Sequence, residues 1–441
     1  MDKGEIHMNA SERIKRIAFS KAYDFLDRDP EQNFLKLVEW LEKLDKNGYI
    51  ARQLPTIQKY ANDPNSNWYR LARSLWDDVD DEVRKTLFTN FMINGNLLEN
   101  QRLTESRKRY QCNIPWMILL CPAGEASENG DGGETGGLSF DDMDNIVEQG
   151  KELGVYFYLF FGREPVGHCD DIIALCNKNS DCVFLCQTNG TIVDSDFAQE
   201  LLRVRNLIPA ITVREPLETS ARQREAMEIL REHRLAFGAL CQYSAANWDS
   251  VSSEAFFDDL ILRGAKFAWF TTYLPVGTGG RPEKIVTAEQ RETVYRRIHQ
   301  FRKSKAIFTL DFFNDGTMTG GCLGGGRGYF FINAAGEAEP CAFLHYTDSN
   351  IHEKSLLEIL QSPLFQSIRE HQPLDANLLR SCPIADHPEC LEALICESGA
   401  VSSSRRDREE PQALAQKCTA CAQNWAETAD RLWQESRGDK V

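Results

Sequence analysis

The sequence contains no apolar run near the roughly 18 residues that a membrane-spanning helix needs. It also lacks an excess of positive charge, because 50 Lys and Arg face 66 Asp and Glu, for a net charge of -16. Nucleic-acid binding relies on clustered Lys and Arg that neutralise phosphates, so this charge argues against a nucleic-acid partner. The N-terminal segment is charged and lacks the apolar core of a secretory signal, and we therefore expect a cytoplasmic protein.

Cysteine, in contrast, is abundant: the chain has 14, and seven of them follow residue 320. In a reducing cytoplasm, clustered thiolates indicate metal or iron–sulfur ligands rather than disulfides, whereas single cysteines are usually small core residues. Cys418 and Cys421 are separated by two residues, a metal-ligand spacing that suits zinc as well as iron.

Hydrophobic periodicity predicts an N-terminal helical segment over 1–110 and then strands that alternate with helices over 111–311. The strands are expected at Trp116–Cys121, Val155–Phe161, Cys182–Gln187, Leu207–Val213, Phe237–Tyr243 and Phe267–Tyr273. The helices are expected at Ser139–Leu153, Cys169–Asn177, Ser195–Val204, Arg222–His233, Ser252–Arg263 and Ala288–Arg302. This alternation predicts parallel pairing through helical crossovers. Six units are too few for a closed eight-fold barrel, so the predicted fold class is α/β, a partial (β/α)6 TIM-like barrel.

Residues 312–441 predict a small Cys-rich α+β C-terminal domain. A seventh apolar run, Ala306–Asp311, leads into it, and a glycine-rich segment follows. Alternating residues before a glycine turn predict a hairpin over 328–337.

Short motifs at the strand ends resemble those of radical S-adenosylmethionine (SAM) enzymes over roughly residues 110–425. Gly162-Arg163-Glu164-Pro165 after the second strand resembles the Gly-Gly-Glu-Pro motif of that family, and Gln187-Thr188-Asn189-Gly190 resembles its Thr-Asn-Gly turn. Pro340-Cys341, with Cys322 before it, is similar to the start of a SPASM or twitch auxiliary-cluster domain.

The resemblance implies two groups of site residues. Those expected to bind the cofactor are Gly162, Glu164, Thr188 and Asn189. Those expected to hold an auxiliary 4Fe-4S cluster, with zinc as the alternative, are Cys322, Cys341, Cys382, Cys418 and Cys421.

One part of the family pattern is missing. Radical SAM enzymes hold three irons of a 4Fe-4S cluster with a Cys-x3-Cys-x2-Cys loop after the first strand, because soft thiolates suit such clusters. Here residues 121–137 contain a single cysteine, Cys121. The segment is instead rich in glycine and acidic residues, which predicts a flexible loop; the acidic residues are Glu125, Glu128, Asp131 and Glu134.

The mouth of the predicted barrel departs from the family a second time. Arg163 takes the place of a glycine that permits close backbone approach, and the fourth strand ends in Arg214-Glu215. These departures argue against conventional SAM binding. If the resemblance holds, Cys121, Glu164 and Asn189 should cluster at one end of a partial barrel.

The sequence therefore predicts a catalytically degenerate radical SAM homologue that retains an auxiliary iron–sulfur or other metal site. Such a pseudoenzyme would serve as a scaffold or partner for an intact radical SAM enzyme or another protein. The alternative is an active SAM-dependent or iron–sulfur oxidoreductase or transferase with altered cluster ligation. A zinc-stapled structural protein is the third possibility. No catalytic residue is identified, although Asp311 and Asp315 are candidates if the pocket turns over a substrate.

Overall fold

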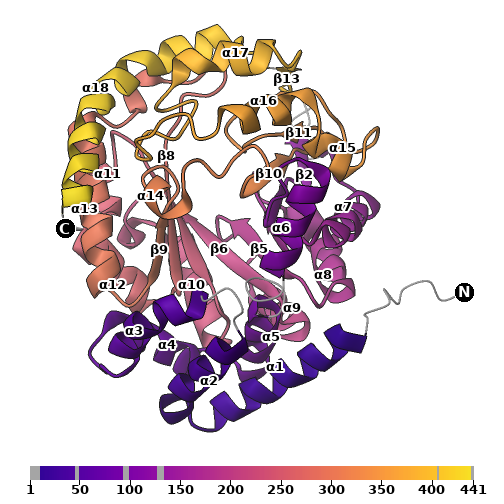
Figure 1. Ribbon diagram of the computed structural model, residues 1–441, viewed down its shortest axis with the longest axis vertical. Coiled ribbons are helices and arrows are strands. Elements are labelled where there is room, and N and C mark those ends of the chain that lie inside the picture. Colours follow the sequence, from indigo (N-terminus) through magenta and orange to yellow (C-terminus); the bar gives the residue numbers. More distant parts are fainter. Residues whose placement is uncertain (1–9, 45–48, 93–98, 127–133, 405–406, 439–441) are drawn as a thin grey trace, which may run out of the picture.

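A computed structural model describes residues 10–44, 49–92, 99–126, 134–404 and 407–438. Its central feature is a nine-stranded sheet in the order β11-β10-β1-β4-β5-β6-β7-β8-β9 (Figure 1). The pairs from β1 and β4 through to β8 and β9 are all parallel. These strands are β1 (Met117–Leu120), β4 (Phe157–Phe160), β5 (Val183–Thr188), β6 (Leu207–Val213), β7 (Gly238–Tyr243), β8 (Phe267–Thr272) and β9 (Phe308–Asp311).

Helices cover the outer face of the curved sheet. They are α7 (Phe140–Leu153), α8 (Cys169–Lys178), α9 (Ser195–Val204), α10 (Ala221–Glu232), α11 (Trp248–Val251), α12 (Glu254–Leu262) and α13 (Ala288–Ser304). The partial barrel, its six strands and its six crossover helices are therefore confirmed. The predicted six units are extended by β9, and by two strands from the C-terminal region.

Alternation along each strand divides the apolar side chains between two cores. In β1, Ile118 and Leu120 pack toward the helices, whereas Met117 and Leu119 pack inside the barrel. Residues i and i+2 of a strand share a face, so a mostly apolar strand can contribute to both cores. Side chains that point inward near the carboxyl ends of the strands are consequently the ones that can form a site.

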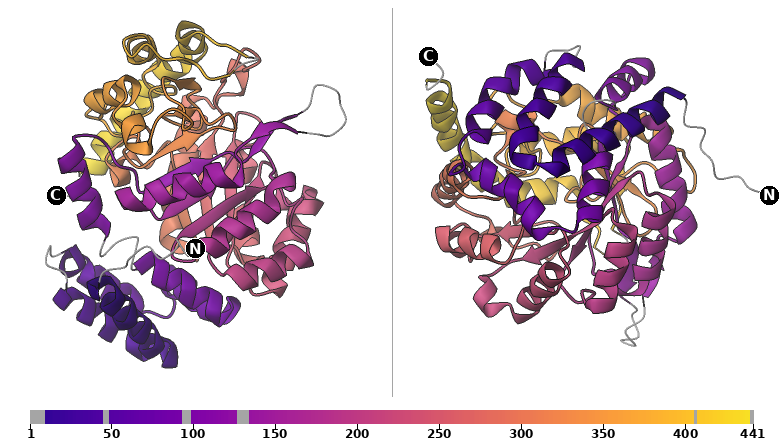
Figure 2. Two further views of the ribbon diagram at one scale, coloured as in Figure 1. Left: turned by 90° about the vertical axis from the view of Figure 1, so that its right-hand side faces the viewer. Right: turned by 90° about the horizontal axis from the view of Figure 1, so that it is seen from below.

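The N-terminal helices close the amino ends of the strands, opposite the C-terminal elements (Figures 1 and 2). They are α1 (Ala10–Arg28), α2 (Pro30–Leu44), α3 (Tyr49–Ala61), α4 (Asn67–Asp78) and α5 (Asp81–Asn90), whereas α6 (Glu99–Tyr110) lies beside α7 (Figure 1). The Asn90 amide donates to the backbone oxygen of Cys182 at 3.0 Å, and Lys266 pairs with Asp78 at 2.5 Å. Because Cys182 and Lys266 directly precede β5 and β8, these contacts fix the helices under the barrel.

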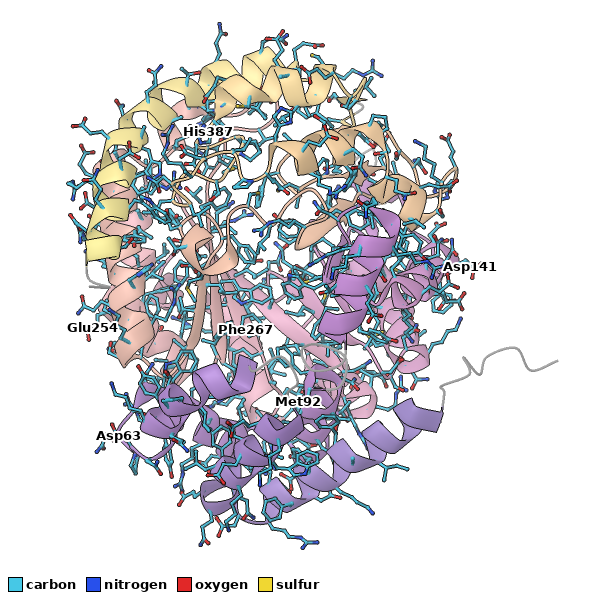
Figure 3. All side chains as sticks on the ribbon, in the orientation of Figure 1. Asp63, Met92, Asp141, Glu254, Phe267 and His387 are labelled. Carbon is cyan, nitrogen blue, oxygen red and sulfur yellow. The ribbon has the colours of Figure 1, made fainter. Side chains whose placement is uncertain are left out.

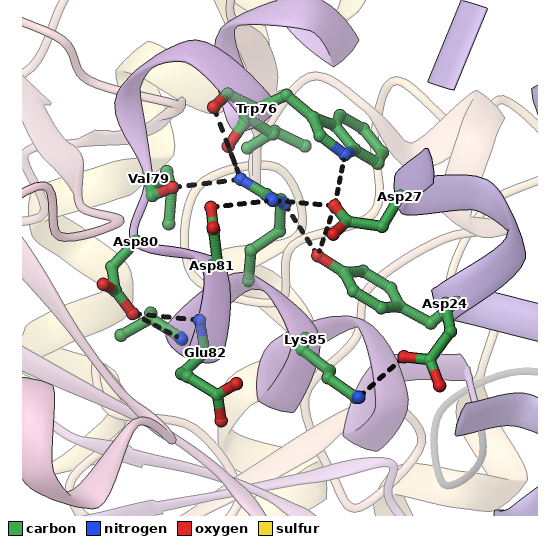
Figure 4. Close-up of polar contacts among 12 residues, drawn as sticks. Asp24, Asp27, Trp76, Val79, Asp80, Asp81, Glu82 and Lys85 are labelled. Atoms are coloured by element: carbon green, nitrogen blue, oxygen red, sulfur yellow. Dashed lines mark hydrogen bonds and ion pairs between the residues drawn. The ribbon is translucent and has the colours of Figure 1, made fainter. Parts of the chain in front are cut away.

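A buried arginine organises this N-terminal cap (Figure 4). The guanidinium of Arg84 pairs with Asp27 at 2.8 Å and donates to the hydroxyl of Tyr23 at 2.7 Å and the backbone oxygen of Val79 at 3.0 Å. Its side chain is only 7% exposed. A cation this deeply buried is tolerated only when its donors are satisfied, so the network joins α1 to α5.

The C-terminal region is partly continuous with the barrel. Strand β10 (Tyr329–Ile332) pairs in parallel with β1, Met117 opposite Tyr329, and antiparallel with β11 (Ala338–Glu339). The predicted hairpin is confirmed, and it also extends the barrel sheet. The other elements are α14 (Gly316–Thr319), β12 (Tyr346–Thr347), α15 (Leu356–Leu360), α16 (Pro363–His371), α17 (Leu391–Cys396), β13 (Val401–Ser402) and α18 (Pro411–Gly438).

Figure 3 places His387 among these C-terminal elements, at the end of the molecule opposite Asp63 of the N-terminal helices. Within the described ranges, no helix is both long and apolar enough to cross a bilayer.

The prediction of a flexible segment over 121–137 is wrong for its two flanks. They form an antiparallel hairpin of β2 (Ala123–Ala126) and β3 (Glu134–Gly137), which projects from the barrel (Figure 2). Residues 127–133, which include Glu128 and Asp131, lie outside the described residues. Backbone hydrogen bonds between β2 and β3 order the two flanks. Gly136 and Gly137 adopt positive φ angles there, which a bulky residue resists.

Candidate cluster site and barrel cavity

The barrel mouth brings Cys121 and Gly162 into contact at the carboxyl ends of β1 and β4. Gly162 has a φ of +121°, and a Cβ atom there would lie 2.8 Å from the Sγ of Cys121. The thiol of Cys121 is buried and donates to the backbone oxygen of Ala123 at 3.4 Å. Glycine is therefore required at 162 both by its backbone conformation and by the neighbouring sulfur.

Glu164 and the turn after β5 form a hydrogen-bonded unit. The Glu164 carboxylate accepts the backbone N–H of Asn189 at 2.6 Å, the hydroxyl of Thr188 and the backbone N–H of Ile192 at 3.4 Å. The structure thus clusters all four residues expected to bind the cofactor, together with Cys121, at one end of the partial barrel. Because both carboxylate oxygens already accept hydrogen bonds from the turn, Glu164 holds the turn in place.

Arg163 is exposed and forms no ion pair with Glu164 among the described residues. The roles assigned to Gly162, Glu164, Thr188 and Asn189 in cofactor binding stay predictions.

Two cavities that share part of their lining lie at this mouth. An outer cavity of about 260 Å³ is lined by Glu164 and Asn189, and an inner one of about 240 Å³ lies between the strands. Both are lined by Gly162, Gln187, Thr212 and Arg214. Gln187 accepts the backbone N–H of Gly162 at 3.2 Å and donates to the Thr212 hydroxyl at 3.2 Å. These contacts join the ends of β4, β5 and β6 around the cavity.

Sequence reasoning did not identify the inner cavity. Its polar side chains, Gln187, Gln242 and Thr271, lie near the carboxyl ends of β5, β7 and β8. The available signal was a polar residue that interrupts an otherwise apolar strand at its last or second-last position. Such residues point to the mouth of a barrel, where ligands bind.

Asp311 and Asp315, the conditional catalytic candidates, do not line either cavity. Asp315 pairs with Arg302 at 2.7 Å, and Asp311 accepts the Asn314 amide at 2.6 Å. Both carboxyl groups are buried in the packing between β9 and α13, so they are structural rather than accessible to a ligand.

Three cysteines of the C-terminal region converge on one apolar cavity. Cys322, Cys341 and Cys382 line it together with Leu344 and Phe343. Gly324 N–H donates to the Sγ of Cys322 at 3.4 Å, Ala385 N–H donates to the Sγ of Cys382 at 3.4 Å, and the hydroxyl of Tyr329 contacts the Sγ of Cys341 at 3.2 Å. Each sulfur therefore has a polar neighbour of the kind that orients and stabilises a thiolate.

Burial raises the pKa of all three thiols, and that of Cys341 rises to about 12. Without a counter-charge these groups stay protonated, because a thiolate is costly in an apolar cavity. A bound metal group supplies the positive charge that removes the protons, so the donor set and its hydrogen bonds fit an iron–sulfur cluster. Among the described residues, no three His, Cys, Asp or Glu side chains are close enough to share a single ion.

Cys418 and Cys421 are not brought to the same cavity. Both lie on the continuous helix α18 and line a second, smaller cavity with Arg291 and Trp425. The predicted set of five ligands is therefore divided by the structure into a group of three and a separate pair. The segment that contains Ile384 and Ala385 lies between them, since each of these residues lines one of the two cavities.

Comparisons with known proteins agree with this arrangement. Residues 322–384, which contain the three converging cysteines, match the SPASM family, described as an iron–sulfur cluster-binding domain. A curated relative is the AdoMet-dependent heme synthase of Nitratidesulfovibrio vulgaris, 23% identical over 265 residues, which cover 51% of this chain and 70% of that protein.

The fold is similar to that of SuiB from Streptococcus suis. SuiB bound to S-adenosylmethionine aligns with a TM-score of 0.51 at 16% identity, over 65% of this chain and 76% of SuiB. SuiB bound to its precursor peptide SuiA aligns with a TM-score of 0.50 at 17% identity, over 65% and 75%. At these identities the alignments establish the fold alone. The SPASM match over residues 322–384, the curated relative and the motifs at the strand ends make the chain similar to radical SAM superfamily proteins with a SPASM domain.

Proposed function

We propose that the protein is an iron–sulfur oxidoreductase of this superfamily, with altered cluster ligation, that acts on a small molecule inside the barrel. The proposal rests on the contact between the cysteine cavity and the inner barrel cavity. Phe312, Tyr329 and Phe343 line the cysteine cavity and the inner barrel cavity alike. Only these three side chains are common to both linings among the described residues, so a group bound by the cysteines would lie next to a ligand in the barrel.

Cys322, Cys341 and Cys382 are the proposed ligands of the cluster. Three thiols spaced around a cavity suit a cluster better than a single zinc ion, whose tetrahedral ligands must meet at one point. When bound, the cluster supplies one-electron transfer. Tyr329 contributes a hydroxyl to the Sγ of Cys341, and this contact would strengthen as the sulfur takes up negative charge.

Conventional cluster ligation at the mouth is not part of the proposal. Residues 121–137 provide one thiol, from Cys121, and the Glu164 carboxylate is engaged by the turn after β5. SAM binding by another arrangement at the outer cavity remains an outcome for experiment. The comparisons favour an enzyme over a degenerate partner protein, because the curated relative is itself named as a synthase.

The deciding experiment measures iron and acid-labile sulfide after anaerobic purification, with SAM binding followed by calorimetry on the same sample. We expect iron and sulfide in near-equal amounts and an electron paramagnetic resonance signal after reduction. Replacing Cys322, Cys341 and Cys382 together by serine should abolish the iron, the sulfide and the resonance signal. The matched control, with serine at Cys418 and Cys421, should retain them.

Three results would contradict the proposal. Zinc without sulfide in the unmodified protein would indicate a structural metal site. Loss of iron in the Cys418 and Cys421 variant, with retention in the triple variant, would move the site to α18. A protein that holds iron but responds to no reductant or oxidant would support the earlier prediction of a partner or scaffold protein.

A further inference from the structure

Described residues give the inner barrel cavity a lining that is aromatic and carries positive but no negative charge. Its walls include the aromatic rings of Phe161, Trp269 and Phe312. Among the described residues that line it, Arg214 carries the one formal charge, and no carboxylate is present. A cationic ligand would find no carboxylate among these residues and would be repelled by the guanidinium.

Two donors in this lining have no partner among the described residues. The indole Nε1 of Trp269 is buried without a hydrogen-bond acceptor among the described residues. The guanidinium of Arg214 makes no ion pair or hydrogen bond to any described residue. The Trp269 donor is buried, whereas Arg214 is exposed at the rim of the cavity. Buried donors in native proteins are nearly always satisfied, so an unpaired one in a cavity calls for a ligand that offers an acceptor.

The backbone around the cation is held firmly. The side-chain amide of Asn247 donates to the backbone oxygen of Arg214 at 2.6 Å and to that of Gln242 at 3.0 Å. Its carbonyl oxygen accepts the backbone N–H of Ser244 at 2.6 Å. Asn247 thus ties the ends of β6 and β7 together, so the arginine extends from a fixed point at the rim of the cavity.

We propose that the inner cavity binds a small aromatic carboxylate, with its carboxylate on Arg214 and its ring against Trp269. This inference rests on the proposed function, which makes the barrel interior the substrate site. A dry cavity of about 150 Å³ is enough to hold benzene. The cavity of about 240 Å³ therefore accommodates one aromatic ring and a short acidic side chain. Arginine suits a carboxylate because its planar donors match the two oxygens.

The test is calorimetric titration of the anaerobically purified full chain with 3-phenylpropionate, 3-phenylpropanol and 3-phenylpropylamine. The acid should bind more tightly than the alcohol by at least about tenfold, and the amine should not bind, because charge pairing in a partly desolvated site provides that margin. Arg214→Gln should weaken the acid by at least about tenfold and leave the alcohol unchanged, and Trp269→Phe should weaken it severalfold.

Arg163→Gln is the matched control, because it removes the same charge from another exposed position, two strands away, that does not line the cavity. It should alter acid binding less than about twofold, since a charge without contact to the ligand is screened by solvent. Arg214→Lys keeps the charge but loses the planar pair of donors, so it should bind the acid better than Arg214→Gln does, which separates loss of the ligand contact from loss of folding. Titration with N-acetylphenylalanine and with Gly-Gly-Phe distinguishes a free acid from the carboxyl end of a peptide.

Equal binding of the amine and the acid, or equal effects of Arg163→Gln and Arg214→Gln, would overturn the inference. Iron and sulfide are measured on the same samples. Acid binding without a cluster would refute the proposed oxidoreductase and leave this ligand class standing. A cluster without acid binding would refute this ligand class and leave the proposed oxidoreductase standing.

Discussion

Arg291 of α13 and Asp386, four residues after Cys382, form an ion pair of 2.6 Å whose side chains are 6% and 0% exposed. The other carboxylate oxygen of Asp386 accepts the backbone N–H of Cys382 at 2.9 Å. The guanidinium also lies 4.1 Å from the ring centroid of Trp425 on α18. One buried pair therefore connects the barrel, the cysteine cavity and the C-terminal helix.

Replacing Asp386 by Asn should destabilise the protein by about 3 kcal/mol, because it leaves the Arg291 cation buried without a counter-charge. The side-chain amide that replaces the Asp386 carboxylate can still accept the N–H of Cys382. The loss of stability therefore measures the missing charge and not a broken turn. Guanidinium denaturation measures the change, and Glu200→Gln in the exposed pair with Arg203 is the control, with an expected loss below about 1 kcal/mol. A loss no larger than that of the control would show that the buried pair contributes little.

The N-terminal cap offers a second test at Arg84. Arg84→Met keeps most of the side-chain volume but removes the cation that pairs with Asp27 and donates to Tyr23 and the Val79 carbonyl. Among the described residues, Asp27 then keeps only neutral donors, including the indole N–H of Trp76. The expected cost is about 2–3 kcal/mol, as for other losses of a hydrogen-bonded buried cation. The exposed Arg73 provides the comparison, since Arg73→Met should cost less than about 1 kcal/mol. Equal unfolding midpoints for the two variants would contradict the buried network.

Local periodicity was sufficient to predict the strands and helices of the barrel, because each unit alternates within about thirty residues. The parallel pairing of β10 with β1 was not predictable in this way. Tyr329 lies opposite Met117 across more than two hundred intervening residues, and neither strand carries a local signal for the other. The predicted domain boundaries at 110 and 311 stay predictions.

The site residues likewise divide into those that local motifs predict and those that depend on tertiary packing. Glu164 and Asn189 were identified from short motifs whose geometry is local to two adjacent strand ends. The separation of Cys418 from Cys382 depends on how a long helix packs against the rest of the fold, which spacing along the chain does not encode. Arg214 was noted as a departure from the family pattern, but its place in a cavity without carboxylates required the structure.

Gly162→Ala tests the contact at the mouth of the barrel. The new methyl group would meet the Sγ of Cys121 at 2.8 Å in a backbone conformation with φ of +121°. Strain of this kind costs about 1–3 kcal/mol before the clash is added. Gly167→Ala is the control, because nothing lies within 4 Å of its Cβ position.

Adding Cys121→Ala to Gly162→Ala should recover the steric part of the loss and leave the backbone part. Thermal unfolding of the two single variants and the double variant separates the contributions as a double-mutant cycle. A double variant as unstable as the sum of the single changes would show that the sulfur and residue 162 are not in contact.

The last prediction concerns pH. Burial, followed by the nearby charge of Asp315, raises the pKa of Asp311 from 3.8 to about 6. The folded protein therefore binds this proton more tightly than the unfolded chain does. Its stabilising contribution is complete below the unfolded pKa and is lost as the pH rises through about 6. Two pH units correspond to about 3 kcal/mol.

Asp311→Asn removes this titration while keeping the side-chain volume. The free energy of unfolding of the variant, minus that of the unmodified protein, should thus become more favourable by up to about 3 kcal/mol between about pH 4 and pH 7. Urea denaturation at half-unit steps of pH measures this difference and cancels the titration of all other groups. A difference that stays flat, or that falls as the pH rises, would mean that Asp311 is ionised in the folded protein throughout, with the Asn314 amide and the Phe313 N–H satisfying its charge.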